Sequence, residues 1–290
     1  MSMEKNTTEP ISRRNAVFTI LGTVLASIEK AEAANQNTKL SLTHTFGDGV
    51  KLWEVEHNSK KNGELVTFEP GKSTFKLYTR AKEGHQFGFD NNRNKFPGQS
   101  VIQCAGPFYS YKNHKIIEGL LIQDGTVIKT HPANRNATAL VIFNQGQIQI
   151  QILPTSTVSA DNLKKKGLDA FQQVPIIVNG KKNSKFLDHT NLDASFDCLR
   201  FLIEFKYQNG YTDHGIIDLK GPVTRRDAVN TIEGLNSKYR SVHQALWLDT
   251  GSVSGGKIYD GNNGSTLRGR SIGPYKDLGK YQATMIGGVK

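Results

Sequence analysis

An aspartate at the end of an apolar run is the first candidate for chemistry in this sequence. Asp249 follows the run Ala245-Leu246-Trp247-Leu248 and precedes a loop of small residues over 250–256. A short apolar run bounded by turn residues predicts a buried strand. The carboxylate would then lie at a sheet rim, beside backbone N–H groups that a ligand could approach. A strand ending in an ordinary turn accounts for the same residues, and spacing alone leaves both interpretations open.

The first residues have the order of a secretory signal. A twin arginine, Arg13-Arg14, precedes an apolar stretch over 16–28, and Ala31-Glu32-Ala33 resembles a cleavage site. This order predicts a signal peptide over residues 1–33, and the twin arginine favours Tat export to the bacterial periplasm or cell envelope. An ordinary buried N-terminal helix is the alternative. No later segment reaches transmembrane length.

The chain is basic, which bears on its partners. Its 290 residues carry 37 Lys and Arg against 26 Asp and Glu, a formal net charge of +11. Residues 1–33 hold four basic and four acidic side chains, so their removal leaves the charge unchanged. Such an excess favours anionic partners, including an anionic glycan or a glycosyl phosphodiester. No zinc-finger, RNP-type or basic-zipper pattern occurs, so nucleic acid is not an expected partner.

Short strands outnumber helices in the rest of the sequence. Alternating apolar residues separated by turn residues predict antiparallel strands. Asn-Gly and Asp-Gly pairs predict hairpin turns at 60–63, 124–125 and 179–180. Thr224 and Asp227 predict a capping box at the start of the clearest helix. We therefore predict a disordered polar segment over 34–40 and a single α+β domain over 41–290, strand-rich, with mixed or antiparallel sheets and few helices.

Five segments between about Gln99 and Gly256 resemble, in their order, the phosphodiester glycosidase domain family. They are 104–108, 118–125, 172–180, 200–203 and 245–256. In the family these places hold an Asn-Ala-Gly segment, a Gly-Leu strand with an Asp-Gly hairpin, a Gln-Ser-Gly-Pro segment, an Arg-Asn pair and a Leu-Asp-Gly-Gly-Gly-Ser stretch. The family is related to N-acetylglucosamine-1-phosphodiester alpha-N-acetylglucosaminidase and has exported bacterial members. The resemblance implies one domain of that kind.

The resemblance implies hydrolysis of a sugar-1-phosphodiester, with an envelope glycan or exopolysaccharide as the expected substrate. A phosphate leaving group needs charge stabilisation, which an arginine fork supplies, and the oxocarbenium-like sugar needs a carboxylate. The implied catalytic carboxylates are Asp249 and Glu118. The implied phosphate-binding residues are Arg200, Gly251, Ser252 and Gly255, and further site candidates are Cys104 and Gln172.

Each of these roles has a plainer alternative. Arg200 could form a structural salt bridge, Asp249 could cap a loop, and Glu118 could be an exposed strand-end charge. At motif positions Cys104 and Phe201 replace asparagines, while Val174 and Thr250 replace glycines. These changes favour a non-catalytic protein that binds anionic glycans on the same fold, whereas Arg200 and Asp249 favour the hydrolase.

The cysteines and histidines leave further alternatives. Cys104 and Cys198 could form one disulfide in an oxidising compartment, or could be two buried thiols. A cysteine nucleophile is a third interpretation. The histidines are scattered without a His-x-x-x-His pair. No cofactor is therefore predicted, although a divalent metal is not excluded.

Overall fold

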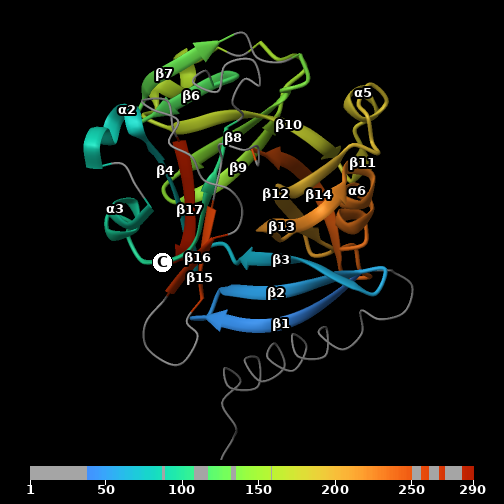
Figure 1. The fold of residues 1–290 in the computed structure, drawn as a ribbon. Helices are drawn as coiled ribbons and strands as arrows, with labels where there is room; N and C mark the ends of the chain where they lie inside the picture. The colour runs from blue at the N-terminus through green and yellow to red at the C-terminus, as the bar shows by residue number, and fades with distance from the viewer. Residues whose placement is uncertain are drawn as a thin grey trace, which may run out of the picture.

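The structure, a computed structural model, describes residues 38–86, 89–107, 117–131, 135–157, 159–249, 256–260, 268–271 and 283–290. Its strands form two sheets (Figure 1). The larger has 12 strands, with the main order β1-β2-β3-β13-β12-β14-β10-β6-β7, and the smaller has five, in the order β16-β15-β5-β17-β4. The predicted strand-rich α+β class is confirmed.

The strands of the larger sheet are β1 (Thr38–Phe46), β2 (Val50–His57), β3 (Lys60–Phe68), β6 (Gly119–Gln123), β7 (Thr126–His131), β8 (Ala139–Asn144), β9 (Gln147–Ile152), β10 (Asp169–Val178), β11 (Lys181–Lys182), β12 (Ser195–Tyr207), β13 (Thr212–Thr224) and β14 (Arg240–Leu248). Those of the smaller sheet are β4 (Ser73–Thr79), β5 (Gln99–Ala105), β15 (Gly256–Asp260), β16 (Arg268–Ser271) and β17 (Ala283–Val289). The described strand pairs are antiparallel.

The helices of the described residues are short. They are α2 (Arg80–Glu83), the 3-10 turn η1 (Gly84–Gln86), α3 (Phe89–Asn94), α4 (Asp161–Lys165), α5 (Ser184–Leu187) and α6 (Arg225–Glu233). The capping box predicted for α6 is present, because the Thr224 hydroxyl accepts from the backbone N–H of Asp227 while the Asp227 carboxylate accepts from that of Thr224. None of these helices is long and apolar enough to cross a membrane.

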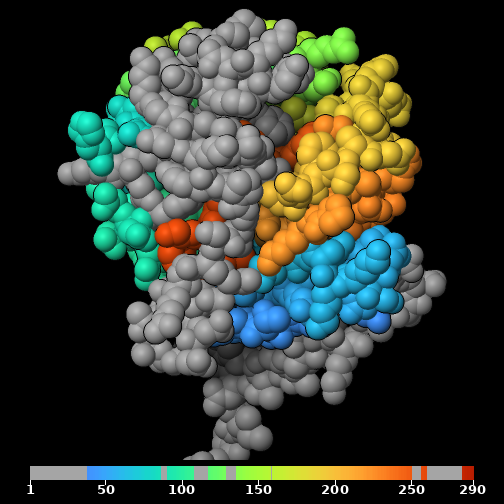
Figure 2. Space-filling model, in the orientation of Figure 1, coloured from blue at the N-terminus to red at the C-terminus, as the bar shows by residue number. Residues whose placement is uncertain are grey.

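Two hydrophobic clusters use opposite faces of the larger sheet. One lies between the sheets, where Leu202 and Leu246 meet Ile102 and Met285. The other lies on the outer face, where Phe201 and its neighbours pack with Ile232 of α6. In Figure 1, α5 and α6 lie together at the right, and β1 to β3 run across the lower part of the view. In the space-filling view of Figure 2, the blue residues of β1 to β3 lie beneath the yellow and orange ones.

Two boundaries differ from the sequence-based expectation. β1 begins at Thr38, whose hydroxyl lies 2.7 Å from Nδ1 of His57, so residues 38–40 belong to the sheet rather than to a disordered segment. The turn between β2 and β3 is at Asn58 and Ser59, with φ of 50° and 61°, and not at 60–63 as predicted. Gly63 instead lies inside β3, where a Cβ would come 2.7 Å from Cδ2 of Leu219. The lack of a side chain at Gly63 therefore allows close packing of the strands, and Gly63 is not part of a turn.

The other predicted hairpin turns are confirmed. Asp124 and Gly125 join β6 to β7 with φ of 49° and 66°, and Asn179 and Gly180 follow β10 with φ of 50° and 77°. Both pairs have the two positive φ angles that a type I′ turn requires.

Candidate functional site

The candidate site lies where the chain passes from one sheet to the other. Leu248, the last residue of β14, pairs with Arg200 of β12, and Asp249 follows it directly. Gly256, the first residue of β15, pairs with Cys104 of β5 in the smaller sheet. The segment from Asp249 to Gly256 therefore connects the two sheets. We call the surrounding residues the crossing site, which comprises Cys104, Cys198, Arg200, Asp218 and Asp249.

A buried ion pair is the centre of the crossing site. Arg200 and Asp218 are register partners on β12 and β13. Oδ1 of Asp218 lies 2.8 Å from Nη2 of Arg200 and accepts a hydrogen bond of 3.0 Å from its Nε. The two residues are 0% and 1% exposed. The salt-bridge alternative for Arg200 is thus present in the structure, and the guanidinium lies beneath the surface.

Carboxylates continue in line from this pair across the sheet. Asp218 pairs with Glu64 of β3, and Glu64 pairs with Glu54 of β2. Exposure of the side chains falls inward, from 33% at Glu54 and 16% at Glu64 to 2% at Asp218. Each carboxylate contacts a cation, since Lys61 is 2.8 Å from Glu54 and Lys220 is 3.1 Å from Glu64. The crossing site thus lies at the buried end of a row of ion pairs.

The charge state of the pair follows from burial and from mutual attraction. Burial alone would lower the pKa of Arg200, but the adjacent Asp218 carboxylate raises it. An arginine already titrates far above neutral pH, so the guanidinium is charged. Burial pushes the pKa of Asp218 upward, and the Arg200 charge opposes this. The result is a fixed positive charge held by a carboxylate in a low-dielectric interior.

Both cysteines border the ion pair. Cys104 and Cys198 are buried and are not joined by a disulfide. Burial raises the pKa of Cys104 to about 11, and burial followed by the Asp218 charge raises that of Cys198. Because the thiolate is the reactive form, a thiol with a pKa this high is a poor nucleophile at neutral pH. A cysteine nucleophile is therefore disfavoured at this site.

Asp249 lies at the outer end of the crossing site. It is buried, at 6% exposure, and its charge contributes to the raised pKa of Cys198. This places Asp249 beside β12, near the cysteine that precedes Arg200 by two residues. The predicted phosphate-binding residues Gly251, Ser252 and Gly255, together with Thr250, lie outside the described residues.

Gln172 was predicted as a site residue, and in the structure its side chain forms hydrogen bonds with the backbone of three other segments. Its Oε1 accepts from the N–H of Leu120 at 3.0 Å, and its Nε2 donates to the carbonyls of Ala137 and Ser156 at 2.7 and 2.6 Å. The next residue lies nearer to the crossing site. Gln173 is fully buried and donates to the carbonyl of Gly106, two residues after Cys104, at 2.5 Å. Sequence reasoning missed Gln173 because adjacent strand residues face opposite sides of a sheet.

Glu118 directly precedes β6, and β6 and β14 both neighbour β10 in the order β14-β10-β6. The strand β10 therefore lies between the strand that carries Glu118 and the strand that leads to Asp249. Glu118 is partly buried. The strand order thus places the two predicted carboxylates beside different neighbours of β10.

Asp218 is a residue of the crossing site that was not predicted from the sequence. It is a lone acid in the apolar run Ile216-Ile217-Asp218-Leu219. An acid in an otherwise buried strand requires a partner of opposite charge. This requirement could have identified Asp218 from the sequence. In the part of the chain that the structure describes, no three or more His, Cys, Asp or Glu side chains are grouped to hold a metal ion.

The comparisons with known proteins give a distant similarity to a solved structure. No protein-family model matches the chain, and no curated protein matches it. Among solved structures, it is similar to the zebrafish N-acetylglucosamine-1-phosphodiester alpha-N-acetylglucosaminidase catalytic domain, auto-inhibited by its pro-peptide. The identity is 11%, the match covers 88% of this chain and 84% of that chain, and the TM-score is 0.48. The similarity concerns the strand-rich fold and assigns no role to any residue.

Proposed function

We propose that this protein is an exported hydrolase that releases the sugar from a sugar-1-phosphodiester in an envelope glycan or exopolysaccharide. The observation that carries the proposal is the gathering of Arg200, Asp218 and Asp249 where the chain crosses between the sheets. Arg200 and Asp249 belong to segments that resemble phosphodiester glycosidases in the sequence. These segments are far apart along the chain, and the pairing of β12 with β14 brings them together.

The reaction divides the work between a carboxylate and a positive charge. Asp249 activates the attacking water or stabilises the oxocarbenium-like sugar. The phosphate leaves as a weak base, so it needs charge stabilisation more than a proton. Backbone N–H groups of the loop that holds Gly251, Ser252 and Gly255 would contact the phosphate oxygens.

Arg200 contributes from beneath the surface. Its guanidinium is fully buried and ion-paired, so its charge acts in a medium of low dielectric. In such a medium its electrostatic interaction with a distant charge is screened less than it would be in water. Asp218 is a positioning residue, because it holds Nε and Nη2 of Arg200 through one oxygen. Glu118, which directly precedes β6, is the proposed second carboxylate.

A second candidate function is binding of anionic glycans without catalysis. Two observations favour it: the engagement of Arg200 by Asp218, and the net charge of +11. A binding protein of this kind retains ligand through long-range attraction, so its affinity falls steeply as salt is added.

Turnover by matched variants tests the proposal. The purified protein is incubated with a panel of sugar-1-phosphodiesters, with and without EDTA or added divalent ions, and released sugar is measured. Asp249→Asn should reduce release on the order of a thousandfold, since it removes the catalytic carboxylate. The control is Asp188→Asn, which changes an exposed aspartate after α5 in the same way. It should retain the wild-type rate.

The two functions give opposite results. Sugar release that survives in Asp249→Asn would remove Asp249 from the mechanism. No release across the panel, with salt-sensitive retention on anionic glycans, would establish the binding protein. Export is tested separately by replacing Arg13 and Arg14 with lysine in a bacterium that has the Tat route. The chain should then stay in the cytoplasm instead of appearing outside it with its N-terminus after Ala33.

A further inference from the structure

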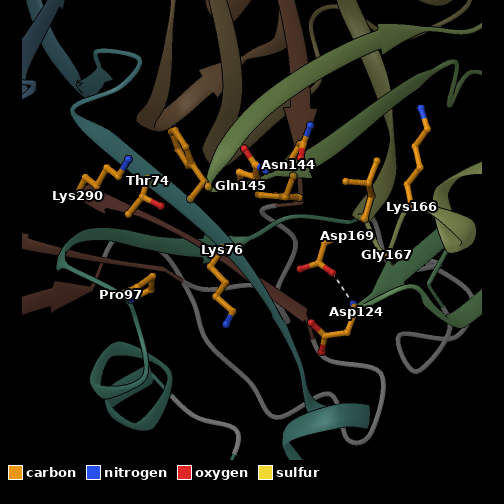
Figure 3. A pocket seen from close by; sticks show the side chains of 14 residues that line it. Thr74, Lys76, Pro97, Asp124, Asn144, Gln145, Lys166, Gly167, Asp169 and Lys290 are labelled. Atoms are coloured by element: carbon orange, nitrogen blue, oxygen red, sulfur yellow. Dashed lines mark hydrogen bonds between the residues drawn. The ribbon is translucent and has the colours of Figure 1, made fainter.

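A pocket of about 540 Å³ lies apart from the crossing site and shares no residue with it. It lies between strand β4, at the edge of the smaller sheet, and tight turns of the larger sheet (Figure 3). The turns are those after β6 and β8 and the glycine after α4, at Gly125, Gly146 and Gly167, with φ of 66°, 78° and 63°. Its volume is in the range of pockets that hold small ligands.

Direct contacts hold these turns together. The Asp124 N–H donates to Oδ1 of Asp169 at 2.5 Å, which joins the β6–β7 turn to the start of β10. The carbonyl of Gly146 accepts from the N–H of Phe75 at 2.8 Å, which joins the β8–β9 turn to β4. At Gly125 a Cβ would come 3.1 Å from Cα of Gly167. The pocket is therefore formed by the fold itself, without a ligand to shape it.

The polar lining carries both signs of charge. Lys76, Lys166 and Lys290 contribute ammonium groups, and Asp124 and Asp169 contribute carboxylates. Figure 3 shows the two aspartates together on one side of the pocket and Lys290 on the opposite side. An anion attracted by the lysines would meet the carboxylates, and a metal cation attracted by the carboxylates would meet the lysines. The lining thus disfavours a ligand with a concentrated charge of either sign.

Hydroxyl groups fit such a lining. A hydroxyl donates one hydrogen bond and accepts up to two, so neighbouring hydroxyls can donate to a carboxylate and accept from an ammonium group. Thr74, Asn144 and Gln145 add groups that also donate and accept, while Phe75 and Phe143 add apolar surface. We propose that this pocket binds a saccharide through its hydroxyl groups, as a second glycan site distinct from the crossing site.

The pocket and the crossing site are related through one strand. Asp169 and Gln173 lie four residues apart on β10 and so face the same side. At about 3.3 Å per residue, they are roughly 13 Å apart. Phe171, fully buried, lies between them. The two sites share no residue, and the pocket does not depend on the hydrolysis proposed for the crossing site.

Amide NMR of the isotope-labelled protein tests the proposal. The probes are N-acetylglucosamine, glucose and galacturonic acid, with inorganic phosphate and calcium chloride as the competing ligand classes. A saccharide should shift the amide signals of Gly125, Gly146 and Gly167. The matched variants are Lys166→Ala, which alters the lining, and Lys165→Ala, which alters its exposed neighbour outside the lining. The first should weaken saccharide binding about tenfold, and the second should leave it unchanged.

The outcomes separate the alternatives. The proposal is overturned if no saccharide shifts the three glycine signals, if only phosphate or calcium does so, or if both lysine variants bind equally well. Asp249→Asn distinguishes this proposal from the proposed activity. Its saccharide-induced shifts should equal those of the wild type, whether or not the wild type releases sugar.

Discussion

Arg200 and Asp218 face each other across β12 and β13, with Nη2 2.8 Å from Oδ1 and both side chains hidden from solvent. Replacing both residues of such a pair with apolar residues changes the stability of the protein little. Removing only one partner is strongly destabilising, because the other charge is then buried without compensation.

Removal of one partner should therefore be severe. Asp218→Ala should lower the free energy of unfolding by about 3–5 kcal/mol, and the double variant Arg200→Met with Asp218→Leu should recover much of that loss. Denaturant unfolding measures both. Asp193→Asn, which breaks the exposed pair with Arg226, is the control and should have little effect. Equal losses in the single and double variants would contradict a compensated pair.

The thiols provide a test of burial at the crossing site. Cys104 and Cys198 are buried and are not linked to each other. A thiol reagent should react with neither in the native protein and with both after unfolding without reductant, since burial excludes the reagent and keeps the thiols protonated. If the unfolded, unreduced protein shows no thiol, the two cysteines form a disulfide.

Two pocket glycines should differ in their tolerance of alanine. Gly146→Ala and Gly167→Ala both place a Cβ on a residue of positive φ, which costs about 1 kcal/mol. At Gly146 the new Cβ would also collide with the Thr74 hydroxyl, whereas nothing lies within 4 Å at Gly167. Thermal unfolding should therefore show the larger loss for Gly146→Ala, and equal losses would show that the β8–β9 turn does not pack on β4.

A buried aspartate should give the protein a pH-dependent stability. Burial raises the pKa of Asp213 to about 6, although Arg240, Tyr207 and His214 oppose the rise. In the unfolded chain this carboxyl titrates near 3.9. The folded state therefore binds the proton more tightly, and this group makes stability fall as the pH rises from about 4 to 6.

Asp213→Asn should remove that slope. We expect the variant to exceed the wild type by on the order of 2 kcal/mol at pH 7, because it keeps an acceptor for the Tyr207 hydroxyl without a buried charge. The advantage should vanish near pH 4, and denaturant unfolding across this range measures it. The exposed Asp48→Asn is the control and should follow the wild-type profile. A constant difference at all pH values would contradict titration of Asp213.

Local sequence chemistry predicted the elements whose causes are local. The capping box of α6 and the turns at 124–125 and 179–180 depend on residues within four positions of one another, and all three are confirmed. The turn at 60–63 was wrong because the Asn-Gly signal competes with long-range pairing. Gly63 is needed where β3 passes close to Leu219, and Asn58 and Ser59 form the turn instead.

The crossing site was predictable only in part. Asp249 stood out by its position after an apolar run and Arg200 through the family resemblance, and the structure brings their strands together. Asp218 did not stand out, because its importance comes from a strand register that places it opposite Arg200. Gln172 and Gln173 show the same limit. They are chemically identical neighbours and both are buried, and only the sheet decides which of them lies toward the crossing site.

Strand β17 has a consequence for the synthesis of the protein. It lies between β4 and β5, although β4 ends at Thr79 and β17 begins at Ala283. The larger sheet has all its strands once Leu248 has left the ribosome, whereas the smaller sheet lacks a central member until Val289 has followed. During that interval β4 and β5 present unpaired edges, which favour association with other chains. Residues 283–289, which lie far along the chain from β4, thus complete the layer that carries Cys104, and a chain truncated before Ala283 would leave β4 and β5 without the strand that joins them.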